Sequence, residues 1–298
     1  MSTHAVTLDP RRISRLALFV HKSKALPLLL LLPCMAWIFV FFIVPLMLMI
    51  GRSFVQDGFS LAIYGDLATS PQYIKVMLNS LKIVALTTIA TLILGYPVAY
   101  VLTMSGGWTR IAILTLVTIP YWVDVIVRSF SWLIVLGDNG IVNKTLLNVG
   151  LIAAPLPLLY NLTSVLLAMV QILLPMMIIT LFGAMLRIDR NLLLAAKIHG
   201  ASDFQAFRNV FFPLSLPGVY GACLLVFVIG LGFYVTPALL GSPAQTMISQ
   251  TIMIEANENL DYERASAAGA LLLLITLTII RIYNRWFGLD RLWGGTER

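Results

Sequence analysis

The chain has 298 residues, of which 59% are hydrophobic and only 11% are charged. A typical soluble domain carries about 25% charged residues, because charged side chains cover much of its surface. The composition therefore excludes a soluble globular protein and predicts a polytopic membrane protein. The formal net charge of +7 would also suit a nucleic-acid-binding protein, but the placement of the basic residues gives it another explanation.

Six segments are long and apolar enough to cross a bilayer, which takes about 20 apolar residues. They cover residues 26–50, 78–104, 111–136, 162–186, 214–240 and 265–283. We therefore predict an all-α fold with six transmembrane helices. The first segment has no small-residue cleavage site, so we expect a retained helix and not a cleaved signal peptide. Helix-breaking residues within four of the spans predict kinks: Pro97, Pro120, Pro175, Gly230 and Gly232.

The basic residues orient this bundle. If the N-terminus is cytoplasmic, 14 of the 20 Lys and Arg residues fall in inside segments and only 4 in outside segments. Cytoplasmic loops carry such an excess, so we expect a multi-pass protein of the cell (inner) membrane with both termini in the cytoplasm. The chain then divides into a basic N-terminal segment (1–25), a six-helix transmembrane domain (26–283) with its main inside loop at 187–213, and a tail (284–298). The net charge is a sign of topology, and we expect no nucleic-acid partner.

A polar segment at residues 194–213 separates the fourth and fifth predicted spans on the inside. Asp189 and Asn191 are N-cap residue types ahead of a helical pattern over 192–199. Gly200 follows, and glycine is the residue best able to end a helix in the left-handed conformation. The local sequence therefore predicts a short helix with a defined beginning and end.

A second short helix is expected to begin after Ser202, because Gln205 three positions later completes a capping box, and to end at Pro213, where the next span begins. Two short helices meeting at a glycine would present a compact surface of small and aromatic side chains. These are Ala195, Ala196, Phe204, Phe207 and Phe211. Such a surface suits insertion into a groove on a partner, whereas an amphipathic loop lying on the membrane is the alternative.

The segment resembles the cytoplasmic coupling loop of permease subunits of binding-protein-dependent, type I ABC importers. That loop follows the pattern E-A-A, three residues, G, nine residues, I-x-L-P. This sequence has Leu194-Ala195-Ala196, then Gly200, then Val210-Phe211-Phe212-Pro213 in the same register, with Leu194 in place of the glutamate. Segments 94–100 and 119–128 are similar to spermidine/putrescine-type permeases, and the similarity extends over about residues 75–285.

The resemblance implies a coupling loop that docks on an ATPase subunit, carried here by Ala195, Ala196, Gly200, Ala201, Ser202, Asp203, Phe204 and Phe207. It also implies the partners: two cytoplasmic ATP-binding subunits, a second homologous permease, and a periplasmic or surface-anchored solute-binding protein. The implied substrate is a small polar solute such as a polyamine or a related organic cation. ATP and magnesium would be bound by the partner subunits, and this chain would hold no cofactor.

The sequence lacks the chemistry of an enzyme. It has no Gly-Lys pair and hence no P-loop, no H-E-x-x-H or G-x-S-x-G motif, and its three histidines, His4, His21 and His199, are far apart. Cys34 and Cys223 both fall in apolar spans and indicate neither a disulfide nor a metal site. We therefore expect that this chain is no enzyme and that any ATP hydrolysis takes place on a partner.

Asp124 and Arg128 are the one ionisable pair that we place at the core of a predicted span, beside Tyr121 and Trp122. Charges inside a membrane are costly and are functional candidates by default. If the third span is one helix, the spacing of four puts both side chains on one face as an internal ion pair. The alternative is that Tyr121, Trp122, Asp124 and Arg128 line the translocation pathway, where a carboxylate and aromatic faces would attract a cation.

The outer segments offer several polar groups that could receive a binding protein, although solvated loops are the simpler interpretation. They are Tyr64, Tyr73, Asp57, Asp66 and the stretches 138–160 and 255–263. Two other classes of protein remain open at this point. A stand-alone ion-coupled secondary transporter would usually carry inverted repeats and several buried charged sites, which six spans with one buried acid fit poorly. A structural or assembly protein of the membrane is the third alternative.

Overall fold

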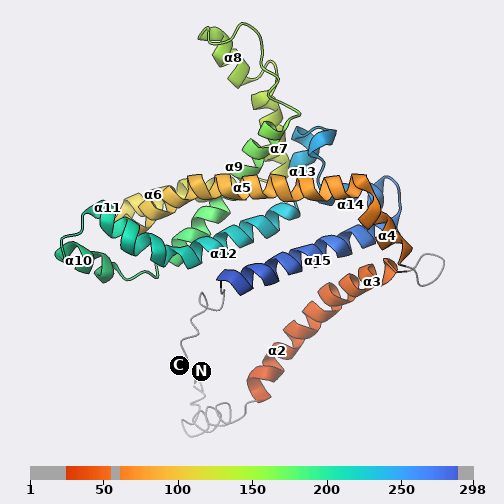
Figure 1. Ribbon diagram of the computed structural model, residues 1–298, viewed down its shortest axis with the longest axis horizontal. Coiled ribbons are helices and arrows are strands. Elements are labelled where there is room, and N and C mark those ends of the chain that lie inside the picture. Colours follow the sequence, from red (N-terminus) through yellow and green to blue (C-terminus); the bar gives the residue numbers. More distant parts are fainter. Residues whose placement is uncertain (1–24, 55–60, 288–298) are drawn as a thin grey trace, which may run out of the picture.

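The computed structural model describes residues 25–54 and 61–287, so nearly all of the predicted segment 1–25, Asp57 and residues 288–298 lie outside it. Every regular element in these ranges is helical (Figure 1). The α-helices are α2 (Ala25–Ile38), α3 (Val44–Arg52), α4 (Ala62–Thr69), α5 (Pro71–Met104), α6 (Gly107–Thr118), α7 (Val125–Leu136), α8 (Ile141–Asn148), α9 (Leu162–Met185), α10 (Arg190–Ile198), α11 (Asp203–Ala206), α12 (Phe212–Leu231), α13 (Val235–Leu240), α14 (Ile248–Asn257) and α15 (Tyr262–Phe287). Shorter turns connect them: the π-helical η1 (Phe39–Ile43) and η3 (Phe207–Phe211) and the 3-10 helices η2 (Ile119–Trp122) and η4 (Pro243–Gln245).

Six helical stretches of the described chain are long and apolar enough to cross a membrane. They are Leu31–Arg52, Pro71–Met104, Val125–Asn148, Leu162–Met185, Asp203–Leu231 and Tyr262–Trp286. The prediction of an all-α fold with six spans is confirmed. Four of the six spans begin and end within about ten residues of the predicted limits, and the other two differ for reasons of local sequence given below.

The core of the bundle is formed by α5, α9 and α12. The 34-residue helix α5 packs along α9, and α12 covers both. Fully buried apolar side chains fill the space between them, among them Val84, Met177, Leu181 and Val226. In contrast, α2 and α3 stand apart from this core and contact the body through α15 (Figure 1). Because an apolar helix with almost no protein contact needs an apolar solvent, this arrangement also indicates a membrane protein.

The predicted third span, 111–136, is not one helix. Helix α6 ends at Thr118, the 3-10 turn η2 contains Pro120, Val123 is extended, and α7 begins only after Asp124. Proline cannot donate a backbone hydrogen bond, and the Asp124 carboxylate accepts one from Ile126 N at 2.7 Å. An N-cap of this kind starts a new helix, so the membrane-length stretch is α7 with α8.

The predicted fifth span, 214–240, is also divided. Helix α12 ends at Leu231, and residues 232–234 separate it from the short α13. Gly230 and Gly232 flank the end of α12, and glycine is a poor helix former. At its other end the same span is longer than predicted, since α11, η3 and α12 follow one another without a break from Asp203.

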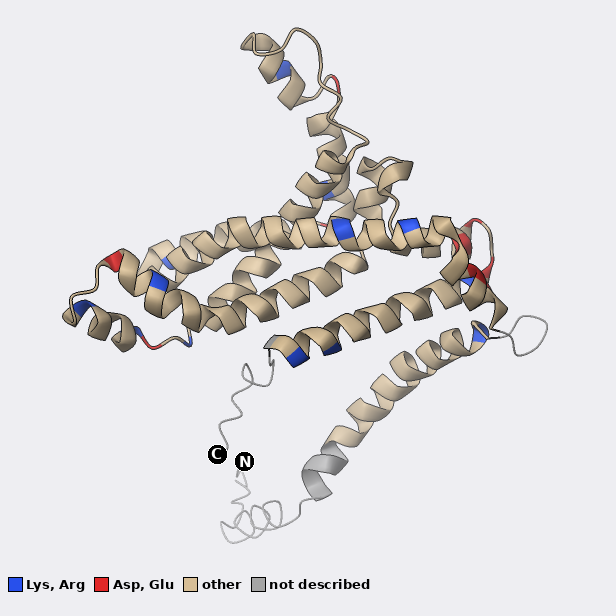
Figure 2. Cartoon of the chain, viewed as in Figure 1, with Lys and Arg blue, Asp and Glu red and all other residues tan. Residues whose placement is uncertain are grey.

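The two ends of α5 carry different surroundings. Its N-terminal end lies beside α4, α14 and the start of α15, where acidic side chains gather, and its C-terminal end lies beside α6, α10 and α11 (Figures 1 and 2). Helices α4 and α14, which carry Asp66 and Glu255 of the predicted outside, thus share one end of the bundle, whereas α8, within the predicted outer stretch 138–160, projects from the body at the tip of α7 (Figure 1). The predicted loop at 194–213 occupies the opposite end.

Candidate functional site

The loop after α9, at residues 187–213, forms an elbow, and the first arm of this elbow is α10. Asp189 precedes this helix, and its Oδ1 accepts a hydrogen bond from Asn191 N at 2.9 Å. At the far end Gly200 has a φ of +87°, with Gly200 N bonded to Lys197 O and Ala201 N bonded to Ala196 O, both at 3.0 Å. This pair of bonds is the Schellman arrangement, in which a left-handed residue closes the helix. The predicted N-cap and glycine stop are both confirmed.

The second arm begins with the predicted capping box. Ser202 Oγ accepts from Gln205 N at 3.3 Å, and Gln205 Oε1 accepts from Ser202 N at 2.8 Å. The prediction that this arm is a separate short helix ending at Pro213 was wrong. Pro213 is the second residue of α12, which follows the π-helical turn η3 without interruption. The arm therefore continues directly into the fifth span.

An ion pair joins the two arms across the glycine. Lys197 Nζ lies 2.5 Å from Asp203 Oδ1, and both side chains are largely exposed. The hydrogen bond and the charge of Asp203 raise the pKa of Lys197 above its ordinary value. Since water screens an exposed pair of this kind, it orients the elbow and contributes little to the stability of the fold.

Three large apolar side chains project from the elbow. Leu194 is 56% exposed, Ile198 is 84% exposed and Phe204 is 67% exposed. Leu194 and Ile198 are four residues apart on α10 and hence share a face. The sequence analysis named Phe204 but did not select Ile198, which the i, i+4 spacing from Leu194 could have indicated.

The other two aromatic residues predicted for this surface face the opposite way. Phe211 is 1% exposed, and Phe207 is partly buried. Both rings pack edge-on against Tyr100, with 5.0 Å between the ring centroids in each case. The prediction that Phe207 and Phe211 belong to the exposed surface was therefore wrong; they attach the elbow to α5.

A hollow of about 430 Å³ lies at the elbow and is lined by three small residues and four larger ones. Its walls are Ala196, His199, Gly200, Ala201, Gln205, Asn209 and Val210. A projecting apolar edge beside a concave surface is the form that receives a side chain from another protein. The predicted small residues Ala196, Gly200 and Ala201 are thus brought together.

The second predicted group, around Asp124, lies at the break between α6 and α7. Asp124 is exposed and caps α7, whereas Arg128 is only 8% exposed. The predicted ion pair between them was wrong: among the described residues the two ion pairs are those of Lys197 and Arg264, and Arg128 Nε and Nη1 have no hydrogen-bond partner. Tyr121 and Trp122, which precede Asp124 in the turn η2, are also exposed.

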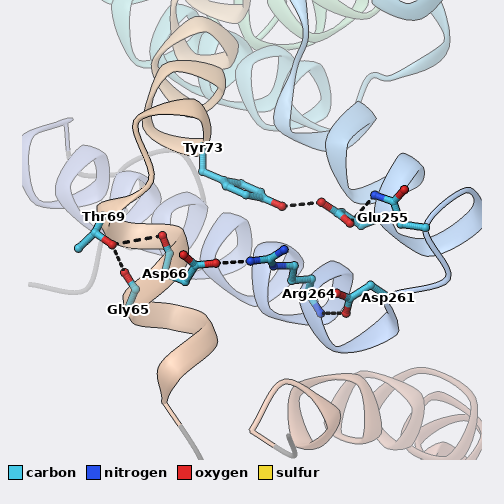
Figure 3. A network of polar contacts seen from close by, with 8 residues as sticks. Gly65, Asp66, Thr69, Tyr73, Glu255, Asp261 and Arg264 are labelled. Atoms are coloured by element: carbon cyan, nitrogen blue, oxygen red, sulfur yellow. Dashed lines mark hydrogen bonds and ion pairs between the residues drawn. The ribbon is translucent and has the colours of Figure 1, made fainter.

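Among the predicted outer groups, Tyr73, Asp66 and the stretch 255–263 form a network of polar contacts (Figure 3). Tyr73 Oη donates to Glu255 Oε1 at 2.6 Å, Asn259 Nδ2 donates to Glu255 Oε2 at 2.8 Å, and Arg264 forms an ion pair with Asp66. These contacts join α4, α5, α14 and α15 at the end of the bundle opposite to the elbow. They hold α4, the start of α5 and the stretch 255–263 together, so these are not separate solvated loops.

Six apolar spans and an elbow that projects from one end define a multi-pass membrane permease with the type I ABC importer fold. A permease of a bacterial alginate ABC transporter, solved in complex with an alginate-bound periplasmic protein, has this fold, with a TM-score of 0.72 and 22% identity over 87% of this chain and 93% of that chain.

The family of binding-protein-dependent transport system inner membrane components matches residues 91–289. Among the relatives is the spermidine/putrescine transport system permease protein PotB of Haemophilus influenzae, which is 32% identical over 84% of this chain and 90% of its own length. PotB of Escherichia coli is 30% identical over 84% of this chain and 93% of its own length. The chain belongs to this family and is an inner-membrane permease subunit of an ABC importer. Membership decides against the stand-alone secondary transporter and the assembly protein.

Proposed function

We propose that this chain imports a polyamine or a related small organic cation, and that ATP-binding subunits drive it through the elbow at residues 187–213. The observation that carries the proposal is the geometry of the elbow. Two capped arms meet at a left-handed glycine and hold Leu194, Ile198 and Phe204 exposed beside a hollow. An apolar edge of this kind fits a groove on a partner protein.

The proposed assembly has four other chains: two ATP-binding subunits, a second homologous permease, and a solute-binding protein on the outer face. This chain then supplies one half of the membrane path. Both termini and the elbow face the cytoplasm. ATP and magnesium bind to the ATPase subunits, and this chain supplies no catalytic residue. Closure of the ATPase pair would draw the two elbows together and open the permeases toward the binding protein.

The polyamine is proposed from the relatives and from the chemistry at the helix break. The relatives that are 30–32% identical are spermidine/putrescine permeases. At the break, Asp124 is exposed, and so are Tyr121 and Trp122, which precede it by three and two residues. A carboxylate attracts an ammonium group, and aromatic faces attract it further, so these three residues suit a cationic solute in the pathway.

The experiment is uptake of radiolabelled spermidine into proteoliposomes that contain the full complex, with binding protein added outside and ATP enclosed. We expect uptake that requires ATP and stops when the ATPase subunits carry an inactivating P-loop substitution. Uptake by this chain alone under an ion gradient would contradict the coupling proposal. If the complex takes up other solutes in an ATP-dependent way but does not take up spermidine, the proposed substrate is wrong and the coupling proposal stands.

A further inference from the structure

Two arginines from different helices meet at the C-terminal end of α5. Arg190, the first residue of α10, donates from Nη2 to the carbonyl oxygen of Thr103. Arg110, in the first turn of α6, donates from Nε to Leu102 O at 3.2 Å and from Nη2 to Ser105 O at 2.5 Å. The last carbonyls of a helix have no partner within that helix, so both arginines complete the end of α5.

The positions of the two arginines on their own helices are unfavourable. Arg190 and Arg110 lie in first turns, where the helix dipole favours negative charge and disfavours cations. Both side chains reach the C-terminal end of α5, where the dipole favours them. The two arginines therefore do not stabilise α10 or α6 themselves. They stabilise the contact of these helices with the C-terminal end of α5.

The contacts extend to a third helix. The guanidinium carbon of Arg110 lies 5.8 Å from the ring centroid of Phe182 on α9, within the range of a cation–π interaction. Thr103 is buried in the last turn of α5, where its carbonyl has no partner within the helix. This carbonyl receives Arg190, and Arg110 Nη2 also lies 3.5 Å from it. The result is a junction of α5, α6, α9 and α10, which we call the arginine junction (Arg110, Arg190 and the carbonyls of residues 102, 103 and 105).

We propose that Arg190 is a positioning residue that makes α10 move together with the end of α5 and with α6. The inference rests on the proposed function, in which ATPase subunits move the elbow. Helix α6 leads directly into η2 and the break at Asp124. The arginine junction thus connects α10, the arm that the ATPase subunits would move, to the segment that carries Tyr121 and Trp122. Without Arg190, the elbow still docks, but its movement no longer reaches α6 in full.

The test compares variants of Arg190 in the full complex. Arg190→Met keeps the aliphatic stem and removes every donor, and Arg190→Lys restores one charged donor group. Arg285→Met removes an exposed positive charge in the last turn of α15. The readout is spermidine uptake per ATP hydrolysed. We expect normal assembly and stimulated ATP hydrolysis in Arg190→Met with a fall of about fivefold or more in this ratio, a partial recovery in Arg190→Lys, and no change in Arg285→Met.

A second readout follows the movement itself. Spin labels at Asn191 and Trp108, both exposed, report the separation of α10 and α6. We expect this separation to stay constant through the nucleotide cycle in the otherwise unaltered complex and to vary in Arg190→Met. A normal ratio of uptake to ATP hydrolysis in Arg190→Met would overturn the inference. So would a failure of Arg190→Met to assemble when Arg190→Lys assembles and has a normal ratio. Failure of both variants to assemble would overturn it as well. A complex without any ATP-driven uptake before substitution would refute the proposed function instead.

Discussion

Gly200 offers the sharpest test of the elbow, because the structure separates backbone strain from crowding at this position. Its φ of +87° lies in the left-handed region, and no atom lies within 4 Å of a Cβ built on it. A side chain at residue 200 therefore meets open space, and its whole cost is the left-handed backbone. That cost is about 1–2 kcal/mol for an ordinary residue, which lowers the population of the bent elbow by about 5- to 30-fold.

The side chain introduced should determine the size of the effect. Asparagine tolerates the left-handed region better than alanine, and a β-branched residue tolerates it least. We therefore expect ATP-driven uptake to fall in the order Gly200, Gly200→Asn, Gly200→Ala, Gly200→Val, with normal amounts of protein in the membrane. The assay is uptake in proteoliposomes together with the amount of ATPase subunit that co-purifies.

A second glycine provides the control. Gly65 in α4 also has no atom within 4 Å of a built Cβ, but its φ lies outside the left-handed region. Gly65→Ala should leave uptake unchanged, because alanine is the better helix former. Equal uptake by Gly200→Val and the unaltered protein would refute the reasoning, as would equal losses in Gly200→Asn and Gly200→Val.

Three further predictions concern the exposed edge, the helix break and the topology. Phe204→Asp should reduce co-purification of the ATPase subunit without lowering the thermal stability of the permease. Phe211→Ala, at a buried site, should cost about 3–5 kcal/mol of folding stability and lower the midpoint of thermal unfolding. Asp124→Asn keeps an N-cap and should reduce spermidine uptake at unchanged thermal stability, while Asp124→Ala should also lower that stability; unchanged uptake in Asp124→Asn would exclude the carboxylate from the pathway. In a background without native cysteines, a cysteine at Glu258 should react with an impermeant thiol reagent in intact cells and one at Ala195 should not, and the reverse labelling would mean an inverted bundle.

Local signals in the sequence predicted the elbow well. The cap at Asp189, the capping box of Ser202 with Gln205 and the stop at Gly200 each depend on residues within five positions of one another. Their geometry is set by backbone hydrogen bonds that the same residues complete. Such features do not require knowledge of the rest of the fold, and the structure reproduces all three.

The direction of the aromatic side chains could not be predicted in the same way. Phe204 and Phe207 are three residues apart and would share a face of a regular helix, yet the first is exposed and the second packs on Tyr100. The π-helical turn η3 begins at Phe207, and the position of α5 decides which rings are covered. Both facts depend on contacts between residues about a hundred positions apart in the chain.

The failure of the predicted Asp124–Arg128 pair has the same origin and bears on how the protein works. The i, i+4 argument requires a continuous helix, but Asp124 stops being a helix residue once its carboxylate caps α7. The carboxylate is then exposed at the break, and Arg128 is buried one turn into the next helix. A capped break between two short helices can change its angle more easily than a continuous helix. Since α6 enters this break directly from the arginine junction, a small rotation of α6 would reorient Tyr121, Trp122 and Asp124 together.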